Sequence, residues 1–131
     1  MAPTRKWYAS SMTTRTTRNL GAFLVFIGAS LLAGYIGGMS TYEYIPTWYN
    51  TLTKPGWTPP NWVFGPVWTT LYVLMGAAAA LVWNSRKSRR RSAVVFFLVH
   101  LVVNAAWSVV FFAQQDLVGA LWIIALLWVM I

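Results

Sequence analysis

Long uncharged runs constrain the fold of this chain more than any other feature. The segments 20–39, 61–84 and 93–113 hold 20, 24 and 21 residues without an acidic residue, a lysine or an arginine. A helix needs about 20 apolar residues to cross the hydrocarbon core of a bilayer. A fourth apolar run, 117–131, has 15 residues and ends with the sequence. We therefore predict an all-α integral membrane protein whose fourth helix is incomplete at its carboxyl end.

The side-chain inventory limits the chemistry. Only 9% of the 131 residues are charged, whereas a soluble domain carries about 25%. The chain has one histidine, two acidic residues and no cysteine. A carboxylate dyad, a histidine-rich metal site and a Ser-His-Asp triad cannot be assembled within the membrane from this set. We expect no metal, no resident cofactor and no disulfide.

Basic residues gather at two places. Residues 1–19 contain four of them and no acid, and we expect a disordered basic tail here, with a transit peptide as the alternative. The run 86–91 holds five more between two predicted helices. Topology explains this run better than nucleic-acid binding does, because cytoplasmic loops are enriched in Lys and Arg. It also suits anionic lipid headgroups. Glu43, Lys54 and Asp116 then lie on the opposite face of the membrane.

The loop 40–60 before the second predicted helix, here called the Trp-Pro loop, is rich in Trp and Pro. Pro55, Pro59 and Pro60 each remove a backbone donor, so this stretch is not a regular helix. Thr58 has the chemistry of an N-cap, and we expect the helix to begin near Asn61. Pro66 should then kink or loosen its first two turns.

Two helical faces carry candidate ligand contacts. Trp68, Tyr72, Ala79 and Trp83 share one face of the second helix. For Trp57, Trp62 and Trp83, a position at the membrane interface is the favoured interpretation. The third helix carries a polar stripe with Trp107 and Phe111 on the adjoining face. That stripe consists of His100, Asn104 and Ser108. Interhelical hydrogen bonding and ligand contact remain open for it. His100 fits a satisfied interior histidine better than a metal ligand.

Small residues recur at helical spacing on the first two helices. Ser30, Gly34 and Gly38 follow at steps of four, and Gly76 and Ala80 form a similar pair. Such faces allow close helix approach. Pairing of helices within the chain and dimerisation are both open.

Two segments resemble a known family. WYNTLTKPGWTPPNWVFGPVWTTLYVLMG at 48–76, followed by NAAWSVVFF at 104–112, is similar to the translocator protein family. That family comprises the tryptophan-rich sensory proteins of bacteria and the peripheral benzodiazepine receptors of mitochondria. The resemblance implies a five-helix transmembrane bundle, usually a homodimer, of which about three and a half helices are present here. It implies multi-pass insertion in a bacterial envelope or mitochondrial outer membrane.

The resemblance also implies a site. The loop 40–60 covers a pocket that in the family binds porphyrins, sterols or flat synthetic ligands. Trp48, Tyr49 and Pro59 match residues that close this pocket. Residues that line it match Trp68, Asn104, Trp107 and Ser108. Ser108 stands where mitochondrial members have proline, and Gly119 where some members carry Trp.

Three functions follow as hypotheses. The first is a porphyrin-binding membrane protein that acts in transport, sensing or scavenging. The second is a light-dependent porphyrin-degrading enzyme in which Trp68 takes part. The third is a structural or regulatory partner without ligand turnover, which depends on the small-residue face of the first helix.

Overall fold

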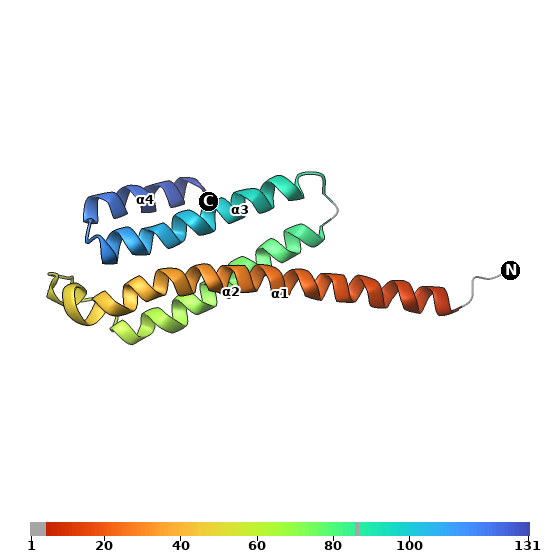
Figure 1. The fold of residues 1–131 in the computed structure, drawn as a ribbon, viewed down its shortest axis with the longest axis horizontal. Helices are drawn as coiled ribbons and strands as arrows, with labels where there is room; N and C mark the ends of the chain where they lie inside the picture. The colour runs from red at the N-terminus through yellow and green to blue at the C-terminus, as the bar shows by residue number, and fades with distance from the viewer. Residues whose placement is uncertain (1–4, 86) are drawn as a thin grey trace.

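The computed structural model describes residues 5–85 and 87–131, and within them the chain is helical apart from short connections (Figure 1). Helix α1 spans Arg5–Tyr44 and runs into a π-helical turn, η1, at Ile45–Tyr49. A 3₁₀ turn, η2, at Asn61–Val63 leads into α2 at Phe64–Asn84. Helix α3 spans Arg90–Ser108 and ends in a second π-helical turn, η3, at Val109–Ala113, before α4 at Leu117–Val129.

Three of these helical segments are long and apolar enough to cross a membrane, as predicted. They are Thr17–Tyr49, Asn61–Asn84 and Arg90–Ala113, while Leu117–Val129 is shorter. The start of the second segment at Asn61 confirms the expected boundary after the two prolines. Asp116 caps α4, because its carboxylate accepts a hydrogen bond from the Gly119 amide at 2.9 Å.

The first helix is longer than predicted at both ends. Residues 5–19, expected to be a disordered tail, are helical, and residues 1–4 lie outside the described part of the chain. No proline or glycine occurs between 5 and 19, so a helix nucleated in the apolar span can extend through them. At the other end, α1 and η1 take up the first ten residues of the predicted loop 40–60. The non-helical connection is correspondingly shorter.

The ends of the bundle differ in charge. The amino-terminal part of α1 and the α2–α3 connection lie at one end, and the loop after η1 and the α3–α4 turn lie at the other (Figure 1). Lys87, Arg89 and Arg91 are exposed at the first end. Arg90 instead folds back, with its guanidinium 5.5 Å from the Trp83 ring. The predicted separation of the basic connection from the Trp-Pro loop along the bundle therefore holds.

The best-packed part of the bundle lies near the basic end. Its core consists of Ala22, Phe26, Ala79, Ala80 and Val94, with Phe23 and Phe97 against it. Gly76 makes this packing possible, because a Cβ placed there would lie 2.5 Å from the Ile27 Cα. Helices α1 and α2 thus touch almost backbone to backbone at this level, as small residues allow.

Candidate ligand cavity

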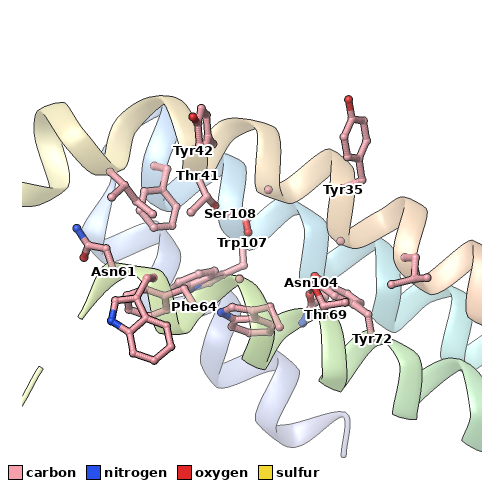
Figure 2. A pocket seen from close by; sticks show the side chains of 18 residues that line it. Tyr35, Thr41, Tyr42, Asn61, Phe64, Thr69, Tyr72, Asn104, Trp107 and Ser108 are labelled. Atoms are coloured by element: carbon pink, nitrogen blue, oxygen red, sulfur yellow. Dashed lines mark hydrogen bonds between the residues drawn. The ribbon is translucent and has the colours of Figure 1, made fainter. Parts of the chain in front are cut away.

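A cavity of about 590 Å³ lies between α1, α2 and α3 in the half of the bundle nearer the Trp-Pro loop. Figure 2 shows the side chains that surround it. Most are aromatic or aliphatic, and a few polar groups are placed among them, including Thr41, Thr69, Asn104 and Ser108. Apolar walls with a small number of polar contacts are typical of small-molecule sites.

The α1 wall is built from glycines and short side chains. Gly34 and Gly38 both line the cavity. At Gly34 an added Cβ would lie 2.5 Å from the Tyr72 ring, whereas at Gly38 it would meet nothing within 4 Å. Thr41 donates its hydroxyl to the Gly37 carbonyl at 3.1 Å, a bond within its own helix. This wall therefore contributes space more than hydrogen-bonding groups.

The wall formed by η2 and α2 contains the large aromatic residues Trp62, Phe64, Trp68 and Tyr72. Pro66 lies in the first turn of α2, directly after the 3₁₀ turn, which agrees with the expected loosening of the helix start. The capping role expected for Thr58 is wrong. Its hydroxyl donates to the Pro55 carbonyl at 2.8 Å, and Pro60 takes the N-cap position without a side-chain hydrogen bond.

The α3 wall carries the polar stripe. Asn104, Trp107, Ser108 and Phe112 line the cavity from this side. The Tyr72 hydroxyl donates to Asn104 Oδ1 at 2.5 Å, which joins α2 to α3. Ser108 packs against α1, since a Cβ at Gly37 would lie 3.1 Å from its Oγ. The interhelical hydrogen bond is therefore present at Asn104, while ligand contact by the stripe stays a prediction.

Four of the eight predicted ligand residues line this cavity: Trp68, Asn104, Trp107 and Ser108. Three others, Trp48, Tyr49 and Phe111, belong to a neighbouring aromatic cluster. Pro59 is exposed in the loop and does not line the cavity. The loop prolines therefore do not close the cavity in this structure.

The aromatic cluster joins the two π-helical turns. Trp48 and Tyr49 in η1 contact Phe111 and Phe112 in η3, and the Trp48 and Phe111 ring centroids lie 5.5 Å apart. Phe111 also stacks on Trp107 at 5.0 Å with the rings 15° from parallel. Trp107 is thus shared between the cluster and the cavity wall, so the cluster supports one face of the cavity from behind.

Several lining residues do not follow from the sequence. Tyr72 is predicted only as a member of the Trp68 face, and Trp62 as a residue of the membrane interface, while no sequence pattern marks Tyr35, Tyr42 or Phe64. The period of four through Trp68 and Tyr72 was the available signal for Tyr72. No comparable signal marks the α1 residues, because an apolar membrane helix shows the same composition on every side.

The remaining polar candidates lie apart from the cavity lining. His100 Nε2 is buried without a hydrogen-bond partner, which contradicts the expected satisfied histidine. Within 5–85 and 87–131, no group of three His, Cys, Asp or Glu side chains is arranged to hold a metal ion. Lys54 donates to the Tyr49 carbonyl, and its Nζ lies 4.3 Å from the centre of the Tyr49 ring.

The small-residue positions pack helices together within the chain. Ser30 is fully buried and donates to the Phe26 carbonyl at 2.9 Å. Gly34 faces Tyr72, Gly76 faces Ile27, and Ala80 is buried in the core. At Gly38 an added Cβ would meet nothing within 4 Å, and Gly38 borders the cavity. The two predicted uses are helix packing within the chain and dimerisation. Four of the five positions serve packing within the chain.

Comparison with known proteins places the chain in a family. Residues 26–131 match the model of the TspO/MBR family, which is most of the chain. The chain belongs to the TspO/MBR family. It is therefore a multi-pass integral membrane protein, and its long apolar helices are transmembrane helices.

Relatives within the TspO/MBR family come from distant organisms. A tryptophan-rich protein TspO from Chlorobaculum tepidum is 40% identical over 107 residues, which are 80% of this chain and 68% of that protein. A tryptophan-rich sensory protein from Cereibacter sphaeroides is 34% identical over 109 residues, 83% of this chain and 66% of that protein. The human translocator protein is 37% identical over 99 residues, 73% of this chain and 59% of its own length.

Proposed function

We propose that this chain binds a porphyrin or a related flat tetrapyrrole in the cavity between α1, α2 and α3, and acts in transport, sensing or scavenging. The observation that carries the proposal is the cavity itself, with a volume of about 590 Å³ and Trp62, Trp68 and Trp107 in its walls. Small-molecule sites occupy about 300–1,000 Å³. Aromatic faces suit a flat apolar macrocycle, because offset stacking adds to the free energy gained by burying its surface.

The names of the relatives agree with this class of function. One is called a sensory protein and another a translocator protein. These names agree with a role in sensing or transport. The side chains that line the cavity include no carboxylate, histidine or lysine.

A titration of protoporphyrin IX into the purified full chain in detergent tests the proposal. We expect saturable binding at one site per protomer, read from the porphyrin absorbance band in the dark. The double variant Asn104→Leu, Trp107→Ala should lose it, since both residues line the cavity. The matched control is Trp128→Ala, because Trp128 is 80% exposed on α4. Non-saturable binding, or equal loss in both variants, would rule out this cavity as the site.

Light-dependent porphyrin breakdown is the second candidate, and the position of Trp68 favours it. Its indole lines the cavity and lies 6.0 Å from the Tyr72 ring between centroids. Illumination of the porphyrin complex in air separates the two functions. Loss of the porphyrin band that is abolished by Trp68→Phe, with binding retained, would identify an enzyme. A stable band under illumination would leave binding as the function.

The third candidate, a structural partner without ligand turnover, depends on Ser30, Gly34 and Gly38 as an intermolecular face. Ser30 and Gly34 pack inside the chain, whereas Gly38 is exposed. Sedimentation of the detergent-solubilised protein would measure whether a homodimer forms.

A further inference from the structure

The hydrogen bond between Tyr72 and Asn104 is the main polar contact between cavity-lining side chains of α2 and α3. The Tyr72 side chain is 6% exposed, and its hydroxyl donates to Asn104 Oδ1 at 2.5 Å. Figure 2 shows the two side chains meeting at one end of the cavity. A carboxamide is planar, so holding its oxygen against Tyr72 also sets the direction of its nitrogen.

The nitrogen of Asn104 is left available. Within the described residues, Asn104 Nδ2 makes no hydrogen bond. If it were buried, it would be a buried atom without a partner, but in those residues only His100 Nε2 is in that state. Asn104 Nδ2 is therefore not enclosed, and the open space beside Asn104 is the cavity. Two N–H donors consequently face the place where a ligand would lie.

Tyr72 also selects this orientation over the flipped one. In the flipped carboxamide, the nitrogen would donate to the Tyr72 oxygen, and the phenolic proton would need another acceptor. Within the described residues the Tyr72 hydroxyl has only Asn104 as a hydrogen-bond partner. A buried donor without an acceptor loses the hydrogen bond that it makes to water in the unfolded chain, which disfavours the flipped orientation. The orientation with the N–H groups toward the cavity is therefore the stable one.

Gly34 gives Tyr72 the room to do this. A Cβ at Gly34 would lie 2.5 Å from Cδ2 and Cε2 of the Tyr72 ring. The ring can therefore occupy its position between α1 and α3 only because residue 34 lacks a side chain. The orientation of Asn104 thus depends on one residue from each of α1 and α2.

We propose that Tyr72 is a positioning residue that turns the Asn104 carboxamide with its donors into the cavity, and that the cavity thereby selects ligands with a hydrogen-bond acceptor, such as a carboxylate, on their edge. The inference rests on the proposed porphyrin-binding function and names the edge chemistry that the site prefers. Hydrogen bonds to an ionised acceptor are stronger than neutral ones, so a carboxylated porphyrin gains more than a purely hydrocarbon one.

Two porphyrins with the same macrocycle test this selectivity. Protoporphyrin IX carries two carboxylates, and octaethylporphyrin has a hydrocarbon edge. Both are titrated into the full chain in detergent, and their dissociation constants are read from absorbance. We expect wild type to prefer protoporphyrin IX by about tenfold. Tyr72→Phe should remove this preference by weakening protoporphyrin IX alone.

The matched control is Tyr44→Phe. Tyr44 is the last residue of α1 and does not line the cavity. This variant should keep the wild-type preference. In a double-mutant cycle, Tyr72→Phe should have no further effect on the preference once Asn104→Leu is present, because Tyr72 acts through Asn104.

Other outcomes overturn the inference. Equal weakening of both porphyrins by Tyr72→Phe would mean that Tyr72 shapes the cavity without orienting Asn104, and independent effects in the cycle would mean the same. If Tyr72→Phe does not fold, Gly34→Ala provides a second route, and retention of the preference there would contradict the mechanism. Wild type that binds both porphyrins alike overturns the inference alone. Wild type that binds neither overturns the proposed function and the inference together.

Discussion

The two halves of the α1–α2 pair differ in how closely the two helices pack. Near the basic end, Gly76 brings α2 against the backbone of Ile27, and Ala79 and Ala80 are buried. Near the Trp-Pro loop, the same two helices are separated by a cavity of about 590 Å³. The change occurs where Gly34 of α1 meets the ring of Tyr72 rather than a small residue of α2.

The difference separates stability from binding. Small residues maximise contact between backbones, and in a membrane this van der Waals contact drives helix association. Aromatic residues facing glycine hold the helices apart and leave room for a ligand. Substitutions in the closed half should therefore change folding, and substitutions in the open half should change ligand affinity.

The largest effect is expected from Gly76→Val in the closed half. Its Cβ would lie 2.5 Å from Ile27 Cα and 2.7 Å from Ile27 N, and backbone atoms cannot move aside as a side-chain tip can. We expect a loss of about 3 kcal/mol or more in stability, measured by thermal denaturation in detergent. Gly28→Val is the control, because a Cβ there meets nothing within 4 Å. Similar melting temperatures for both variants would contradict the close packing.

Trp107→Leu should act on the open half. Trp107 lines the cavity and stacks on Phe111 at 5.0 Å. Loss of its aromatic face should weaken protoporphyrin IX binding by about tenfold, measured from the porphyrin absorbance band. Trp128→Leu on the exposed face of α4 should leave affinity unchanged. If the two variants bind equally well, Trp107 is only a packing residue.

Gly34→Ala should have a smaller effect on stability, at the boundary between the halves. The new methyl group would meet the Tyr72 ring at 2.5 Å, and a ring can move where a backbone cannot. We expect a cost of about 1 kcal/mol, read from the melting temperature. Gly38→Ala, also on the cavity wall, has open space and should cost less. A larger loss of stability for Gly38→Ala than for Gly34→Ala would show that the contact with the Tyr72 ring does not determine the cost.

The smallest effect is expected from Lys54→Met in the loop. Lys54 donates to the Tyr49 carbonyl and does not line the cavity. Its contacts are partly exposed, so their loss should change stability by less than about 1 kcal/mol and protoporphyrin affinity by less than about twofold. A tenfold loss of affinity in the same titration would instead indicate that Lys54 contacts a ligand carboxylate.

Much of the fold could be predicted because its signals are local. The spans follow from uncharged runs, and the start at Asn61 follows from Pro59 and Pro60. The placement of Asn104, Trp107 and Ser108 on one wall follows from helical spacing within α3. Each of these features is decided by residues close together in the sequence.

The remaining features depend on how helices rotate against one another. Helical spacing assigns Tyr72 to a face of the second helix and Asn104 to a face of the third. It does not show that these two residues, 32 positions apart in the sequence, form a hydrogen bond. Gly34 could equally have faced a second chain, because a small residue looks the same in either contact. The π-helical turns could not be predicted either, because the i to i+5 hydrogen-bonding pattern requires no distinctive composition.

The π-helical turn η3 has a consequence for insertions and deletions. The Gln114 amide donates to the Val109 carbonyl, five residues back, at 3.0 Å. Such a turn holds one residue more than an α-helical turn needs. Deleting one residue within Val109–Ala113 would therefore turn the wide turn into regular α-helix. The chain after it would keep nearly the same direction, because a π-helical turn absorbs one extra residue within a single turn. Asn104 and Trp107 precede the turn and would keep their places. A change of one residue in chain length here should therefore be tolerated, with α4 on the same side of α3 and the polar wall of the cavity unchanged.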